Sequence, residues 1–80
     1  MILEELQDDV FRKLEKCYGK YKAYTSFHEA MSVFREEFEE LWDECKKKEL
    51  DFEKIENEII DCLVVLYKMH QDIVIEENRR

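Results

Sequence analysis

Residues 58–67, which read EIIDCLVVLY, decide the fold of this 80-residue chain. Apart from Glu58 and Asp61, every residue in this stretch is apolar. Placed on a helix at about 100° per residue, the stretch leaves almost no polar face. A helix that is apolar all round must be covered all round, and two neighbouring helices of one short chain cannot easily do this. We therefore predict that a second subunit covers part of it, in a symmetric dimer.

Two further helices are predicted on the N-terminal side of this stretch. The first is an amphipathic helix over about residues 2–18, with Gly19 as its C-terminal stop. Ser26 followed by Glu29 is a capping-box pattern, which predicts a second helix over about residues 27–48 that ends in a run of three lysines. The core face predicted for the second helix consists of Phe27, Ala30, Phe34, Phe38, Leu41 and Cys45.

The third helix is predicted to begin after Asp51, its predicted N-cap, and to run to about Glu76. The chain has no proline and one glycine, and 45% of its residues are hydrophobic. These features indicate a single all-α domain that spans residues 1–80, and no repeat or linker divides it.

Composition also excludes some classes of function. A net charge of −8 argues against a nucleic-acid binder, because neutralising phosphates needs clustered basic residues. No apolar run approaches the roughly 18 residues of a membrane span, and the acidic N-terminus does not resemble a signal peptide, so we expect a cytoplasmic protein without membrane contact. The three cysteines, Cys17, Cys45 and Cys62, have no Cys-x-x-Cys spacing and are interpreted as reduced core residues.

Two pairs of carboxylates carry the functional signal. Glu37 and Glu40 lie three residues apart in the second helix, and Glu58 and Asp61 lie three residues apart in the third. On adjacent helices the two pairs would direct four carboxylates into one small volume. Four such charges repel one another unless a cation lies among them. Carboxylate-only ligation favours Mg²⁺, or Mn²⁺, over zinc.

Helical wheels distinguish these carboxylates from the acidic residues on the solvent-exposed faces of the helices. Glu37 lies at the edge of the apolar face of the second helix, and Asp61 is the one charge inside the apolar stretch of the third. A carboxylate in such a place loses hydration unless it is neutralised or coordinated. Glu36 and Glu39 repeat the same spacing, however, so the spacing alone leaves two registers open.

The residues around these pairs resemble a known family. Residues 36–41 (EEFEEL) and 58–61 (EIID) resemble the signature of the MazG-type nucleotide pyrophosphohydrolases, which is Glu-Glu-x-x-Glu, a gap, and Glu-x-x-Asp. Residues 26–30 (SFHEA) and 41–44 (LWDE) are similar to a small, compact branch of that family. The resemblance covers about residues 26–70.

This resemblance implies a MazG-like bundle of three main helices per chain, completed by dimerisation into a homodimer or a dimer of dimers. It implies Mg²⁺-dependent hydrolysis of a nucleoside triphosphate to a monophosphate and pyrophosphate. The implied metal ligands are Glu37, Glu40, Glu58 and Asp61. Either Glu40 or Glu44 would accept a proton from the attacking water.

Three other residues, Lys54, Lys68 and Trp42, each have a functional and a structural interpretation. Lys54 and Lys68 lie on the carboxylate side of the third helix, where they would either contact phosphate or form helical salt bridges. Trp42 would either stack on a base or belong to the core. His28 is expected to make local hydrogen bonds, and His70 to be a core histidine.

A second class of function stays open at this point. A non-catalytic acidic helical module, serving as an oligomeric adaptor, would have the same fold without turnover. The four intact carboxylates favour the enzyme.

Overall fold

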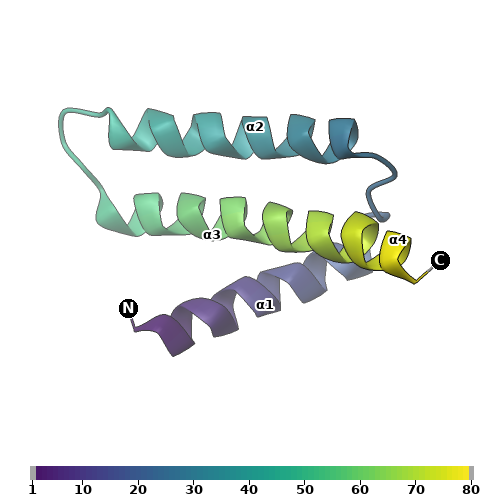
Figure 1. Ribbon diagram of the computed structural model, residues 1–80. Helices are drawn as coiled ribbons and strands as arrows, with labels where there is room; N and C mark the ends of the chain where they lie inside the picture. Colours follow the sequence, from purple (N-terminus) through teal and green to yellow (C-terminus); the bar gives the residue numbers. More distant parts are fainter. Residues whose placement is uncertain (1, 80) are drawn as a thin grey trace.

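The computed structural model describes residues 2–79, and within them all regular structure is helical. Helix α1 spans Leu3–Lys20, α2 spans Phe27–Cys45 and α3 spans Phe52–Met69. Figure 1 shows α2 and α3 side by side as an antiparallel hairpin, with α1 inclined across the opposite side of α3. The prediction of an all-α chain with three main helices is therefore confirmed.

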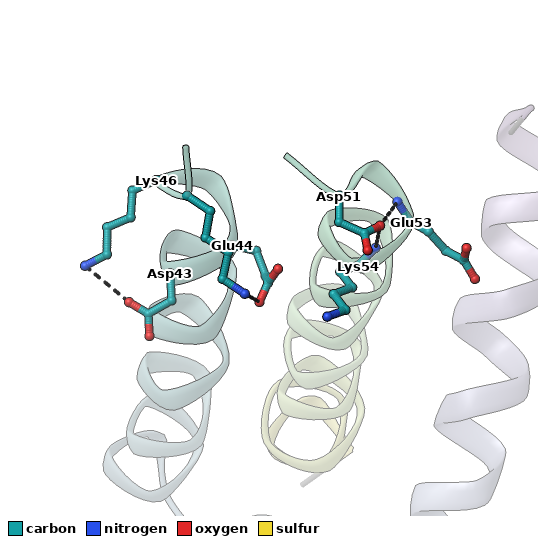
Figure 2. Close-up of polar contacts among 7 residues, drawn as sticks. Asp43, Glu44, Lys46, Asp51, Glu53 and Lys54 are labelled. Carbon is teal, nitrogen blue, oxygen red and sulfur yellow. Dashed lines mark hydrogen bonds and ion pairs between the residues drawn. The ribbon is translucent and has the colours of Figure 1, made fainter. Parts of the chain in front are cut away.

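The two predicted N-caps are present. The Ser26 hydroxyl accepts a hydrogen bond from the Glu29 backbone N–H at 3.1 Å. Asp51 accepts bonds from the backbone N–H groups of Glu53 and Lys54 at 3.1 and 3.2 Å, as Figure 2 shows. The capping box is only half formed, because the Glu29 carboxylate accepts a bond from the hydroxyl of Thr25. Each cap satisfies backbone donors that a helix start leaves unpaired.

Several helix ends differ from the predicted ones. Helix α1 continues through Gly19, which does not have a positive φ, and ends one residue later. Helix α2 ends at Cys45, so the lysine run lies beyond it instead of in its last turn; Lys46 is the C-cap. After Met69 the chain stays helical but changes its winding, first to the π-helix η1 (His70–Ile75) and then to α4 (Glu76–Asn78). The chain is therefore helical up to the predicted end near Glu76, but residues 70–75 form a π-helix instead of the predicted α-helix.

The core is centred on α3, the helix that contacts both of the others. Val10 of α1 packs with Ile60 and Val64 of α3, and all three are almost fully buried. Around them lie four partly buried residues, Leu6, Leu14, Cys17 and Leu63. Most of the buried side chains belong to α3, which agrees with its apolar sequence.

Some residues predicted for the core lie at the surface. Phe27 and Phe38 are each 52% exposed, and Cys45 is exposed, because no described element covers that side of α2. His70 is exposed as well, and its Nδ1 lies 3.1 Å from the side-chain amide of Gln71. The core-histidine prediction was wrong because His70 lies one turn beyond Leu66 and Tyr67, on a side of α3 where these two residues are themselves 42% and 38% exposed. Of the other two cysteines, Cys62 is buried and Cys17 partly buried, as predicted.

A buried ion pair joins α3 to the π-helix. The Lys68 ammonium lies 2.7 Å from the Asp72 carboxylate, and the two side chains are only 3% and 4% exposed. The same ammonium donates to the Lys22 carbonyl at 2.8 Å and lies 3.8 Å from the centre of the Tyr24 ring. The Tyr24 backbone N–H donates to Asp72 at 2.9 Å. This network fixes the loop between α1 and α2 against the C-terminal part of the chain.

Among the described residues, no helix is both long and apolar enough to cross a membrane.

Candidate metal centre

The antiparallel hairpin of α2 and α3 brings the two carboxylate pairs to the same level. Residues equally distant from the turn of such a hairpin lie opposite each other, which places Glu40 near Glu58 and Glu37 near Asp61. The i, i+3 spacing within each pair keeps both members on one face of their helix. The position of these acids thus follows directly from the turn between Cys45 and Phe52.

Three of the four predicted ligands form one cluster. Glu37, Glu40 and Glu58 each offer a carboxylate oxygen, and these three oxygens lie within 4.8 Å of one another. Glu37 and Glu58 are partly buried, whereas Glu40 is exposed. Asp61 is not part of this group of three. Its Oδ1 is instead 2.8 Å from the ammonium of Lys13 on α1.

The proximity of these acids changes their protonation. Burial, followed by the negative charges of Glu40 and Asp61, raises the pKa of Glu37 from its ordinary value of 4.5 to about 7. Burial and then the charges of Asp61 and Glu40 raise the pKa of Glu58 as well. The pKa of the buried Cys62 thiol is raised by burial and then by the charge of Glu37. Asp61 therefore belongs to the same electrostatic cluster although Lys13 holds its Oδ1.

Glu44 lies one turn beyond Glu40, near the same cluster. Its side chain is 16% exposed, and Figure 2 shows it on the side of α2 that faces α3. One of its oxygens, Oε2, accepts a bond from the Lys47 ammonium at 2.6 Å. The other, Oε1, is buried and has no hydrogen-bond partner among the described residues. Oε2 of Glu58 is buried and unpartnered in the same way.

These features fit a hard divalent cation. All the donor atoms are carboxylate oxygens, the ligand type that Mg²⁺ and Mn²⁺ prefer over nitrogen or sulfur. The buried oxygen of Glu58 lacks the partner that buried polar groups normally have, and a coordinated cation would supply one. The convergence of like charges at this distance is unfavourable without a positive charge. Glu37, Glu40 and Glu58, with Asp61 beside them, are the residues suited to hold such an ion.

The three predicted substrate-binding residues lie apart from one another. Lys54 extends from the first turn of α3, near the turn of the hairpin (Figure 2). Lys68 is at the opposite end of α3, where the ion pair with Asp72 holds its ammonium. Trp42 is 56% exposed on α2. His28 is also exposed, and its backbone carbonyl accepts a hydrogen bond from the hydroxyl of Ser32.

A groove next to the cluster was not predicted from the sequence. It has a volume of about 950 Å³ and is lined by residues of α1, α2 and α3 and of the loop after α1. Glu37 and Asp61 belong to its lining, together with four lysines contributed by α1 and the following loop, Lys13, Lys16, Lys20 and Lys22. The one sequence signal for Lys13 is its place next to Leu14 and three residues after Val10, on the side of α1 that packs on α3.

Comparison of this chain with protein-family models, with curated proteins and with solved structures finds no match in any of the three. Its function must therefore be argued from its own residues and their geometry.

Proposed function

We propose that this protein is a Mg²⁺-dependent nucleoside triphosphate pyrophosphohydrolase of the MazG type. It would convert an NTP or dNTP to the monophosphate and pyrophosphate. The observation that carries this proposal is the convergence of carboxylate oxygens from Glu37, Glu40 and Glu58 within 4.8 Å, from two different helices. Asp61, one turn beyond Glu58 on α3, completes the second i, i+3 pair of the motif.

Each acid has a role that follows from its surroundings. Glu37, Glu40, Glu58 and Asp61 would hold the ion, with Mn²⁺ as an alternative to Mg²⁺. A bound Mg²⁺ supplies charge neutralisation at the phosphate oxygens and lowers the pKa of bound water. Glu44 is suited to accept the proton of the attacking water, because its buried Oε1 has a free acceptor site while Lys47 fixes the other oxygen. Glu40, the most exposed of the cluster, is the second candidate for this role.

The surface of the single chain supports the homodimer proposed with this function. The chain exposes 6375 Å², whereas a folded monomer of 9.9 kDa is expected to expose about 5,200 Å². The excess of about 1,200 Å² is more than the roughly 800 Å² that one partner buries in a standard interface. Four of the large apolar side chains that are exposed form a row along α2, which we call the α2 stripe: Phe27, Met31, Phe38 and Trp42, each about half exposed.

The same stripe favours a second candidate function. A non-catalytic adaptor with this fold would use the α2 stripe to bind another protein and would not turn over nucleotide. Apolar patches on small proteins commonly mark such interaction sites. The two candidates make opposite predictions for nucleotide turnover, which separates them.

The experiment is a panel of NTPs and dNTPs incubated with the protein and Mg²⁺, with pyrophosphate as the measured product. We expect turnover of at least one nucleotide, its loss without Mg²⁺, and a reduction of about 100-fold or more in Glu58→Gln or Asp61→Asn. Glu53→Gln is the matched control, since Glu53 is an exposed acid of α3 outside the cluster. Absence of turnover with every nucleotide, or equal turnover in all variants, would leave the adaptor as the better explanation.

A further inference from the structure

The groove beside the acidic cluster has two walls of opposite charge. Glu37 of α2 and Asp61 of α3 lie on the acidic side. On the other side, Lys13, Lys16 and Lys20 follow one another along α1 at steps of three and four residues, which places them on one face of that helix. In a chain of net charge −8, a row of lysines in the groove that adjoins an acidic cluster is a local exception.

We propose that Lys13, Lys16 and Lys20 bind the polyphosphate tail of the substrate. This inference rests on the proposed function and identifies which part of the groove would recognise the triphosphate. It moves phosphate recognition from Lys54 and Lys68 of α3 to α1. The row spans about 10 Å along the helix at 1.5 Å per residue, a length that suits an extended chain of phosphates.

The contact of Lys13 with Asp61 explains how one end of this row meets the cluster. The ammonium lies 2.8 Å from Oδ1 of Asp61, and the two side chains are 43% and 34% exposed. In the metal-free protein Lys13 thus neutralises one of the clustered acids. If a cation were held by the cluster, it would neutralise Asp61 instead, and Lys13 would be available to pair with a phosphate in the groove.

Structural roles do not account for the whole row. Lys20 lies in the last turn of α1, where a positive charge is favourable to the helix dipole, and its ammonium lies 5.4 Å from the Tyr21 ring centre. Lys16 lies a turn earlier, beyond the reach of that effect. Its side chain is exposed and makes no ion pair within residues 2–79. An ammonium group without a partner in the groove remains available for an anion.

Lys68 lines the same groove but is not available in this way. Its ammonium is buried and already satisfied by Asp72, by the Lys22 carbonyl and by the face of Tyr24. Transferring it to a phosphate would leave Asp72 buried without its counter-ion, which is costly. The cationic wall of the groove is therefore the α1 row, with Lys22 at its end.

The test measures binding of inorganic tripolyphosphate by isothermal titration calorimetry, with and without Mg²⁺. We expect the wild-type protein to bind it in both conditions and more tightly with Mg²⁺. Lys16→Gln and Lys20→Gln should each weaken binding about three- to fivefold, as expected for exposed charge pairs. The triple change Lys13→Gln, Lys16→Gln, Lys20→Gln should weaken it more than about tenfold. Circular dichroism checks that each variant is folded.

Arg12→Gln is the matched control. Arg12 is a cation of the same helix, 65% exposed and outside the groove, where it pairs with Asp9. Its replacement should leave tripolyphosphate binding within about twofold of wild type. Absence of tripolyphosphate binding by the wild type, unchanged binding in the lysine variants, or an equal loss in Arg12→Gln would overturn the proposal.

Nucleotide kinetics on the same variants separate this inference from the proposed function. If nucleotide is hydrolysed and the lysine variants keep the wild-type KM and kcat, the enzyme proposal stands and the lysine row is refuted. If tripolyphosphate binding depends on the lysines but no nucleotide is hydrolysed, the row stands as a polyphosphate site and the enzyme proposal fails.

Discussion

The Lys13 ammonium and the Asp61 carboxylate lie 2.8 Å apart and join α1 to α3 across 48 positions of the sequence. This ion pair links the first helix to the acidic cluster. Without it, Asp61 would be one more unneutralised carboxylate beside Glu37 and Glu58, whose pKa values are already raised by burial and by the neighbouring negative charges.

Replacing Lys13 by Met should destabilise the metal-free protein. The loss should be about 0.5–1 kcal/mol, because the pair is partly exposed and solvent screens it. Saturating Mg²⁺ should shrink this difference, since a bound cation neutralises Asp61 in place of the lysine. Urea unfolding with EDTA and with Mg²⁺ measures both values. A loss that is the same in the two conditions would contradict a metal beside Asp61.

The raised pKa of Glu37 predicts a pH dependence of stability in the metal-free protein. Its pKa is about 7 in the folded state and near 4.5 when unfolded, so between these values the folded state binds the extra proton. Stability contributed by this group is therefore lost as the pH rises from about 4.5 to about 7. We expect the free energy of unfolding to fall over this range in EDTA.

Glu37→Gln should flatten that pH dependence, whereas Glu36→Gln should not. This comparison also decides between the two registers of the Glu-x-x-Glu spacing, because Glu36 is exposed on the neighbouring position. Chemical unfolding at a series of pH values provides the measurement. If the two variants change the profile equally, Glu37 is not the group that titrates.

The ion pair of Lys68 and Asp72 should matter far more for stability than that of Lys13 and Asp61. Both side chains are almost completely buried, and Asp72 also accepts the Tyr24 backbone N–H. Lys68→Met leaves a buried carboxylate without its cation and should cost about 3 kcal/mol. Thermal unfolding measures this loss. A variant as stable as wild type would show that the pair is solvated in solution.

The matched comparison is Lys54→Met, a change of the same kind on the same helix. Lys54 is exposed in the first turn of α3, and in the described chain its side chain makes no ion pair. Its replacement should change the free energy of unfolding by no more than about 0.5 kcal/mol.

The α2 stripe should be buried in the interface of a homodimer. Phe38→Glu or Trp42→Glu places a charge in this apolar row, and we expect each to shift the protein from dimer to monomer in sedimentation experiments. Leu3→Glu is the control, since Leu3 is 70% exposed on α1, away from the stripe. A monomeric wild type, or a dimer that survives both stripe substitutions, would contradict this interface.

Local signals explain how much of the fold was predictable. Ser26 and Asp51 are N-caps whose chemistry depends on a few neighbouring residues, and both were recognised from the sequence. The end of α2 at Cys45 was missed because the lysines that follow include no glycine or proline to stop the helix. His70 was misplaced because the apolar residues one turn before it, Leu66 and Tyr67, indicate a covered face that the described chain leaves partly exposed.

In the candidate site, too, helix periodicity predicted some of the residues, and tertiary packing decided the others. Glu37, Glu40 and Glu58 were expected together because their positions depend only on helix periodicity and one hairpin, and the structure brings them within 4.8 Å. Lys13 was missed because its contact with Asp61 depends on how α1 packs against α3. Exposure of Phe38 likewise depends on tertiary packing, because a wheel identifies an apolar face but not what covers it.

The most direct test of the central claim is ³¹P NMR of nucleotide mixed with the protein. Spectra of an NTP and dNTP mixture are recorded with Mg²⁺ and with EDTA, for wild type, Glu58→Gln and the control Glu53→Gln. The proposal predicts monophosphate and pyrophosphate resonances with Mg²⁺ in wild type and Glu53→Gln only. Orthophosphate and a nucleoside diphosphate as products, or an unchanged triphosphate spectrum in every sample, would contradict it.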